Sequence, residues 1–500
     1  MARPVAVPRP RPLPGAFLAG LLAGLALVPA GCGRDAPPTA RPRAVRYAAD
    51  GRPAATGVVA TRRLDVIWVC LDTVRADAFA PWAKGDVAMP ETSAWLDARA
   101  VAFTQASSPA PWTGPAVASL LTGLLPSAHG ARELSEHLSL VPAVTTAAEI
   151  LAAQGWFTVA YTGGGWVAAG NGVLQGFREP MTPFSFAGEG EAVLRVFEAS
   201  RAYRPRFLFF HTYEAHDPYL APPARLNAPA LPPPPVDLAA IDREAAADGG
   251  RSLVRRFLLD GATREAVFGT TFGGPRKVAV TRWLEHGYRA DPQGPALAAE
   301  AKATYVQGLR RLDGALAAWL RALETRGFLD EAMLVVTSDH GEGFGEHGTM
   351  HHGRRLYDEL VHVPLYVRAP GFAAGRRVAA PCSLLDLAPT LLELVGLPPS
   401  DGIDGTSLVP LLAGGPGRPV PSEELRTGAE TGGDDRAQVV AVRDAARKWI
   451  RTTDLRTGTA VEELYDLVAD PGETTPLPEA ALDAFPRAFQ DAVRAHRRTR

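Results

Sequence analysis

The sequence is 500 residues long, and 46% of its residues are hydrophobic while 21% are charged. This balance is typical of a globular protein, and it argues against a largely disordered chain and against a membrane protein with several spans. Lysine and arginine number 52 and aspartate and glutamate 54, so the formal net charge is −2. A nearly neutral chain does not attract the phosphate backbone of a nucleic acid, so we expect no nucleic-acid partner.

Residues 1–31 are predicted to be a signal peptide. Three arginines precede an uncharged apolar run over residues 15–28, which is shorter than the roughly 20 residues of a membrane-spanning helix. The run ends in small residues before Cys32, which resembles a bacterial lipoprotein signal with an acylated cysteine. Cleavage by an ordinary signal peptidase and an uncleaved anchor are the alternatives. All three place the body outside the cytoplasm, and we expect an exported periplasmic or cell-surface lipoprotein that meets the membrane only through its N-terminal lipid anchor.

The body of the chain follows a predicted flexible tether over residues 32–61, which contains too little apolar surface to pack. Short apolar runs then alternate with helical patterns. The predicted strands cover residues 64–71, 157–161, 206–211, 333–337 and 363–368, and the predicted helices cover residues 145–154, 190–202 and 302–326. Strands separated by such helices indicate an α/β fold with a large, mostly parallel sheet flanked by helices on both faces.

Three later regions differ from this pattern. Residues 222–300 contain a proline run, charged helical pieces and Gly-Gly pairs, and we interpret them as an insertion that caps the site, because a structureless loop of that length is unusual. Residues 376–475, with a helix over 382–395 and short strands further on, predict a smaller C-terminal subdomain. Residues 476–500 predict a C-terminal helix with a basic tip.

Polar residues follow three of the predicted strands. Asp72 follows the first strand, residues 211–217 follow a middle one, and Asp339 with His340 follows a later one. Ligand sites of open α/β sheets lie beyond the carboxyl ends of the strands, so these residues are expected to converge. Two aspartates, an imidazole and Thr113 at a loop-to-helix junction can bind one cation, beside which Thr113 would act as a nucleophile.

In these segments the sequence resembles the sulfatase family of the alkaline-phosphatase superfamily. The resemblance runs from about Leu64 to Asp470 and rests on motifs in a fixed order, namely LDTVRAD, SLLTGLLPSAHG, HDPY, SDHGEGFGEHG, SLLDLAPTLLELVGLP, DGIDGTSL and ELYDLVADP. Each motif alone is weak, but their order is specific. The resemblance implies an alkaline-phosphatase-like fold with residues 62–375 as the catalytic domain, and a metal-dependent hydrolase of sulfuric or phosphoric esters.

The nucleophile position departs from the family pattern. Family sulfatases carry a cysteine or serine that is oxidised to formylglycine, followed by proline two positions on and arginine two further. Counting back from Thr122-Gly123 places Thr113 at the nucleophile, Pro115 at the proline and Val117 at the arginine. Threonine cannot become formylglycine by that route, and superfamily members with a threonine nucleophile act on phosphoryl groups. We therefore expect phosphoester hydrolysis to be favoured over sulfate hydrolysis.

The expected metal ligands depart from the family as well. Family sulfatases bring an Asp-Asp pair and an Asp-Asn pair to calcium, whereas this chain has Asp72-Thr73 and Asp339-His340. Exchanging a carboxylate for an imidazole moves the preference towards zinc or manganese, with calcium as the alternative. The divalent metal ion is expected to be bound by Asp72, Thr113, Asp339 and His340.

The resemblance also assigns roles to the remaining histidines. His216 matches the family histidine beside the scissile bond, and His352 stands where relatives carry a substrate-contacting lysine or a further metal ligand, so both are catalytic candidates. Arg75 and His347 are expected to support the residues that touch metal or substrate. The histidines expected to be structural are His211 and His351.

Two other functions fit the same residues. The chain could transfer a phosphoryl-containing group from Thr113 to an envelope sugar or lipid, or it could be a degenerate surface binding protein that has lost its chemistry. Intact Asp72, Thr113, Asp339 and His340 argue against the second alternative. The expected partner is a small-molecule, glycan or lipid ester, and its identity does not follow from the sequence.

Overall fold

The computed structural model describes residues 60–132, 139–141, 143–182, 184–219, 236–261, 263–269, 274–400, 402–427 and 435–497. The predicted signal peptide, its lipidation residue Cys32 and almost all of the predicted tether lie outside the described residues. Among the helices of the described part, none is long and apolar enough to cross a membrane.

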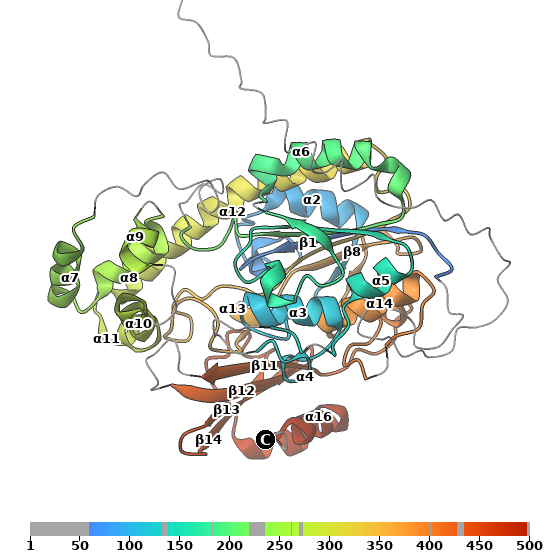
Figure 1. The fold of residues 1–500 in the computed structure, drawn as a ribbon. Helices are drawn as coiled ribbons and strands as arrows, with labels where there is room; N and C mark the ends of the chain where they lie inside the picture. The colour runs from blue at the N-terminus through green and yellow to red at the C-terminus, as the bar shows by residue number, and fades with distance from the viewer. Residues whose placement is uncertain are drawn as a thin grey trace, which may run out of the picture. The chain divides into compact units, whose positions relative to one another are not determined.

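An eight-stranded sheet forms the centre of the fold (Figure 1). The order of its strands is β5 (Arg178–Met181), β4 (Phe157–Thr162), β6 (Arg206–Thr212), β1 (Asp65–Leu71), β7 (Ala332–Ser338), β8 (Leu365–Arg368), β2 (Val101–Phe103) and β9 (Arg377–Val378). The first five strands are parallel, β8 runs antiparallel to β7 and β2, and β9 is parallel to β2. The predicted α/β fold with a mostly parallel sheet is confirmed.

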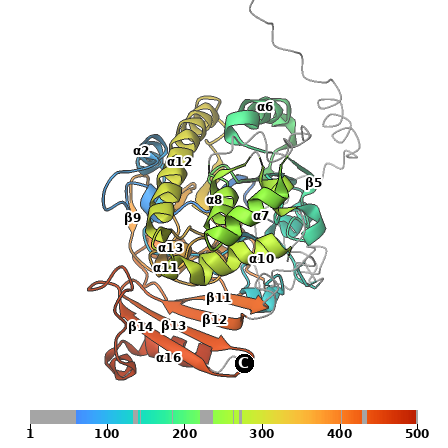
Figure 2. The same cartoon turned by 90° about the vertical axis from the view of Figure 1, so that its left-hand side faces the viewer.

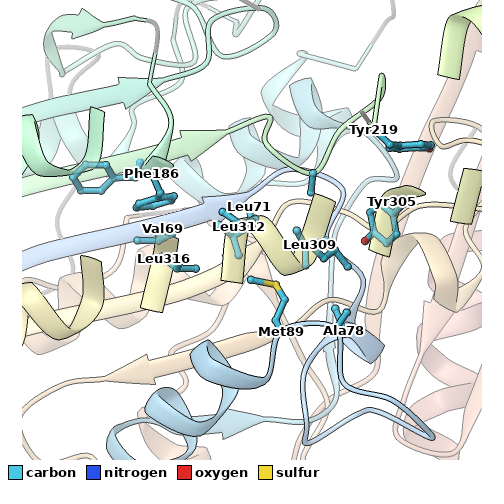
Figure 3. Close-up of a cluster of buried hydrophobic side chains, with 14 of the residues drawn as sticks. Val69, Leu71, Ala78, Met89, Phe186, Tyr219, Tyr305, Leu309, Leu312 and Leu316 are labelled. Carbon is cyan, nitrogen blue, oxygen red and sulfur yellow. The ribbon is translucent and has the colours of Figure 1, made fainter. Parts of the chain in front are cut away.

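Helices cover both faces of this sheet (Figure 1). On one face lie α2 (Pro90–Arg99), α6 (Phe186–Ala199) and α12 (Gly294–Thr325), and on the other lie α3 (Thr113–Thr122), α5 (Ala147–Ala153) and α14 (Leu387–Leu394). Alternate side chains of β1 join the two cores, because successive residues of a strand point to opposite faces. Figure 3 shows Val69 of β1 beside Leu316 of α12, and Leu71 of β1 beside Leu312 of α12.

Helix α12 begins earlier than the sequence pattern predicts. The apolar periodicity suggests a start near residue 302, whereas the helix starts at Gly294 with a proline in its first turn. Proline suits that position because the first helical N–H has no partner within the helix. The helix ends where Gly327 adopts a φ of +68°, and this conformation favours glycine.

The described residues between β6 and α12 form a group of short helices (Figure 2). They are α7 (Leu238–Ala247), α8 (Arg251–Leu259), α9 (Arg264–Phe268), α10 (Pro275–Arg282), a π-helical turn over Trp283–Gly287, and α11 (Tyr288–Ala290). We refer to residues 236–290 as the cap helices.

A second, four-stranded antiparallel sheet lies near the C-terminus. Its strands in order are β11 (Val420–Thr427), β12 (Arg436–Arg443), β13 (Arg447–Asp454) and β14 (Ala460–Asp466), and α16 (Arg487–Arg497) packs against it. Residues 377–394, which the sequence analysis assigned to the C-terminal subdomain, contribute β9 and α14 to the main sheet and its core.

A buried histidine braces α3, the helix that begins at Thr113. His129 is fully buried; its Nδ1 accepts the N–H of Ala131 at 3.1 Å, so its Nε2 carries the proton and donates to the Ser119 hydroxyl at 2.9 Å. Burial lowers the pKa of His129 to about 3. The folded protein therefore holds this ring neutral at pH values at which the unfolded chain protonates it.

The difference in the pKa of His129 between the folded and the unfolded state predicts that the protein is less stable at acidic pH. Because the pKa of His129 is depressed by folding, stability falls as the pH drops below about 6.5, the pKa of histidine in an unfolded chain. Between pH 7.5 and 5.0 this one group should lower the free energy of unfolding by about 2 kcal/mol. We expect the free energy of unfolding of His129→Gln to fall correspondingly less than that of the wild type over this pH interval, as measured by urea denaturation at both pH values. Equal losses in the two proteins would contradict the assignment.

Candidate active site

Three neighbouring strands end at the candidate site. Strand β1 lies between β6 and β7, and in this register Cys70 of β1 pairs with His211 of β6 while Leu71 pairs with Ser338 of β7. The next residues, Asp72 and Asp339, therefore leave the sheet side by side. Both aspartates and His211 are fully buried. The convergence expected from the strand ends is present.

Thr113 meets this group from the first residue of α3. Its hydroxyl donates to Asp72 Oδ2 at 3.0 Å, and its Oγ1 lies 3.3 Å from His340 Nε2. Thr113 is 2% exposed, so its hydroxyl lies in a site largely shielded from solvent. As the first residue of a helix, Thr113 also lies where backbone N–H groups point outward and favour anions.

Asp72, Asp339 and His340 have the features of a cation site. One ligand atom from each lies within 4.8 Å of the others. Asp72 Oδ1 is buried and has no hydrogen-bond partner among the described residues. His340 Nδ1 lies 2.9 Å from the Gly341 carbonyl oxygen, which assigns the ring proton to Nδ1 and turns Nε2 towards the carboxylates. Two buried carboxylates, an orphaned oxygen and an imidazole lone pair fit a divalent metal ion.

His211 lies next to Asp72 and Asp339 and contacts both carboxylates. Its Nε2 is 3.3 Å from Asp72 Oδ2 and 3.5 Å from Asp339 Oδ2. Burial by itself would lower the pKa of His211, but hydrogen bonds to Asp339 and Asp72 outweigh burial and raise it to about 9. In the sequence this residue is marked only by its place at the carboxyl end of a predicted strand. The strand order that makes it a neighbour of Asp72 does not follow from the sequence pattern.

His216 lies on the open side of the cluster. Its Nε2 is 4.0 Å from Asp72 Oδ1, and its Nδ1 is 2.8 Å from Asp217 Oδ1. Burial opposes protonation, but the carboxylates of Asp217 and Asp72 outweigh it and raise the pKa of His216 to about 10. The two carboxylates thus favour the protonated form of His216.

His352 lies beside His216 and His340. The ring centroids are 5.0 Å apart for His352 and His216, and 4.6 Å apart for His352 and His340. His352 Nδ1 lies 3.2 Å from both carboxylate oxygens of the buried Glu342. Burial, and then the neighbouring His351 and His340, hold the pKa of His352 well below the ordinary value of histidine.

Arg75 and His347 take other positions. Arg75 forms ion pairs with Asp77 at 2.8 Å and Glu346 at 2.7 Å, and reaches the site through a hydrogen bond to the backbone carbonyl of Glu342. His347 pairs with Glu359 at 2.6 Å and stacks on Tyr357. Arg75 thus supports the segment that follows His340, and both Arg75 and His347 line a second cavity between this segment and the C-terminal sheet.

A cavity of about 210 Å³ opens at Thr113. Its wall includes Thr113, His216 and His352, together with aromatic and aliphatic side chains and the cationic Lys277. Lys277, Val280, Thr281 and Leu284 of α10 and the π-helical turn repeat at helical spacing, so one face of the cap lines the cavity.

Comparisons with known proteins show the family of this chain. The family model described as sulfatase matches residues 65–397, which is well over half of the chain. The chain belongs to the sulfatase family. A second model, described as the C-terminal region of N-sulphoglucosamine sulphohydrolase, matches residues 345–482. The resemblance stated from the sequence motifs is confirmed.

Curated sulfatases share part of their length with this chain. The choline-sulfatase of Rhizobium meliloti (strain 1021) is 31% identical over 206 residues, which is 39% of this chain and 37% of that protein. Arylsulfatase K of Xenopus laevis is 32% identical over 182 residues, which is 35% of this chain and 33% of that protein. The chain thus spans about a third of the length of these curated relatives.

Solved structures share the fold over most of the chain. A 2-O GAG sulfatase superimposes with a TM-score of 0.62 at 18% identity, covering 87% of this chain and 90% of that one. The phosphonate monoester hydrolase of Agrobacterium radiobacter superimposes with a TM-score of 0.59 at 21% identity, covering 87% of this chain and 94% of the other. The fold thus occurs in proteins named for sulfate and for phosphonate esters.

Proposed function

We propose that this chain is a metal-dependent ester hydrolase that uses Thr113 as its nucleophile and prefers phosphoryl to sulfuryl esters. The observation that carries the proposal is the contact of the Thr113 hydroxyl with Asp72 Oδ2 at 3.0 Å, within the cluster of Asp339 and His340. A hydroxyl placed at buried carboxylates and at a helix N-terminus is the arrangement expected of an activated nucleophile.

The preference for phosphoryl esters follows from the chemistry of threonine. In family sulfatases the formylglycine hydrate has a second hydroxyl, which lets the sulfated intermediate collapse by elimination. Thr113 offers one hydroxyl, so its covalent intermediate has to be released by attack of water at the transferred group. That route suits phosphorus, where in-line displacement can occur twice.

The residues around Thr113 carry the proposed reaction. Asp72 is a poor base, because the neighbouring histidines outweigh burial and hold its pKa well below the usual range, so the Thr113 hydroxyl proton leaves to solvent before the attack. Thr113 Oγ1 then forms a bond to phosphorus while the bond from phosphorus to the leaving oxygen breaks. His216, whose protonated form is favoured by the neighbouring carboxylate of Asp217, is placed to give its Nε2 proton to that oxygen. The N-terminus of α3 stabilises the charge on the non-bridging oxygens.

A divalent cation bound by Asp72, Asp339 and His340 would neutralise negative charge on the transferred group and favour ionisation of the Thr113 hydroxyl. The size of the cavity favours a compact ester, because about 210 Å³ lies below the usual range of about 300–1,000 Å³ for ligand pockets.

A substrate panel tests this function. The full chain, loaded in turn with zinc, manganese and calcium, would be assayed with p-nitrophenyl esters of sulfate, phosphate and phenylphosphonate and with bis-p-nitrophenyl phosphate. We expect kcat/KM for the best phosphoryl ester to exceed that for the sulfate by at least about 100-fold, the scale of discrimination that differences in transition-state binding provide. Faster turnover of the sulfate would overturn the preference, and no turnover with any ester would overturn the function.

A further inference from the structure

One guanidinium connects the cap helices to the candidate active site. Arg264 is the first residue of α9, and its Nη2 lies 2.6 Å from Asp217 Oδ2. Its Nη1 donates to the backbone carbonyl oxygen of the same aspartate at 2.8 Å. Both contacts fall on Asp217, whose side chain is fully buried. One ion pair and one hydrogen bond thus hold the carboxylate and the backbone of the loop after β6.

The other oxygen of Asp217 holds two imidazoles. His216 Nδ1 lies 2.8 Å and His351 Nε2 lies 3.0 Å from Asp217 Oδ1. Asp217 therefore stands between the cap and the site, with Oδ2 towards Arg264 and Oδ1 towards the two rings. His216 Nδ1 also lies 2.9 Å from the backbone carbonyl oxygen of Asp217. The orientation of His216, and with it the position of Nε2 near Asp72, therefore depends on where the carboxylate and the carbonyl of Asp217 are held.

Aromatic packing fixes Arg264 in turn. Its guanidinium lies 4.3 Å from the ring centroid of Phe257 on α8. The Phe257 ring also packs edge-on against His351, with ring centroids 5.7 Å apart. The cap thus contacts this group of residues at two points, and both contacts involve side chains that line the cavity at Thr113.

We propose that Arg264 is a positioning residue, which orients His216 and His351 through Asp217 and thereby makes catalysis dependent on the cap. The proposal rests on the proposed function for its kinetic consequence. Arg264 need not touch the ester, because its two nitrogen contacts are both to Asp217. Without the guanidinium, the buried carboxylate would retain only the two imidazole donors and could rotate away from the position that holds His216.

The test compares Arg264→Ala and Arg264→Gln with a matched control on the same cap. The control is Arg276→Ala, because Arg276 also makes a two-nitrogen contact with an aspartate, Asp242, at 2.8 Å on an exposed surface. With the fastest small ester of the panel, we expect both Arg264 variants to lose about 10- to 100-fold in kcat, the usual effect of losing a residue that orients a catalytic group. KM should change less than about threefold, and Arg276→Ala should match the wild type.

Two further readings separate positioning from a general loss of structure. Guanidinium chloride at millimolar concentration should restore much of the kcat of Arg264→Ala and should leave Arg264→Gln and the wild type unchanged. Nitrogen-15 spectra of the histidine rings, with His216 and His351 identified by substitution, should show carboxylate-bound N–H signals in the wild type and their loss in both Arg264 variants.

These outcomes decide the proposal independently of the proposed function. If the wild type turns over no ester, the function fails, and the ring spectra alone decide the role of Arg264. Unchanged ring signals of His216 and His351 in the Arg264 variants would overturn the proposal, as would a wild-type kcat in Arg264→Ala or a loss of kcat that guanidinium does not restore.

Discussion

Thr113→Ala is expected to abolish turnover, with a loss in kcat of at least about 10⁴-fold, because the reaction loses the group that forms the covalent bond. The substitution removes one hydroxyl and one methyl group and leaves the helix start in place. The fold should therefore survive, at a cost of about 1 kcal/mol for the hydrogen bond to Asp72. The measurement is steady-state turnover of the best ester, together with the thermal unfolding midpoint of both proteins.

Thr113→Ser is the matched control. It keeps the single hydroxyl and should retain turnover within about tenfold of the wild type. Acid quenching of the wild type during turnover should trap a phosphoryl group on the peptide that contains Thr113, and Thr113→Ala should yield none. An alanine variant that still cleaves the ester at a substantial fraction of the wild-type rate would remove Thr113 from the mechanism and, with it, the reason to prefer phosphoryl esters.

The fold can be predicted from the sequence because the patterns that indicate its strands and helices are local. Strand β1 is a continuous apolar run, and it is buried on both faces, as expected for a central parallel strand. Helix α12 shows a clear apolar face, and only its first turns, before residue 302, were missed. The antiparallel sheet of the C-terminal region was seen only in part, because β11 and β14 carry charged residues between their apolar ones and depend on pairing with β12 and β13.

The sequence predicts the site residues that directly follow strands. It does not predict the residues whose place in the site depends on tertiary contacts. Asp72 and Asp339 could be named because each follows an apolar run, and the parallel sheet brings such ends together. The contacts of His211 with Asp72 and Asp339 were not predicted, because they depend on the order of β6, β1 and β7, which the sequence pattern does not contain. Arg264 lies in the cap, 47 residues along the chain from its partner Asp217, and no local signal connects the two.

The Asp72 carboxylate is expected to be essential for binding of the metal ion. Asp72→Asn is expected to lose the bound metal ion and to lower kcat by more than about 100-fold, since even residues that only support metal ligands cost about 10- to 100-fold. Asparagine keeps the shape of the side chain and removes the charge that the cation requires. Metal content after desalting gives the stoichiometry, and the thermal unfolding midpoint with and without added metal gives the linkage to stability. The wild type should gain about 2.7 kcal/mol at a metal concentration 100 times the Kd, and the variant should gain none.

Asp77→Asn is the matched control, because Asp77 lies on the same loop but pairs with Arg75 at 2.8 Å on a half-exposed surface. It should bind metal as the wild type does. Treatment with a chelator should reduce the wild type to the activity of Asp72→Asn, and readdition should restore it. One imidazole beside two carboxylates favours zinc or manganese over calcium, so these two ions should restore the most activity. An Asp72→Asn protein with the metal content of the wild type would place the cation elsewhere, and the contact of Thr113 with Asp72 would then no longer explain how its hydroxyl is activated.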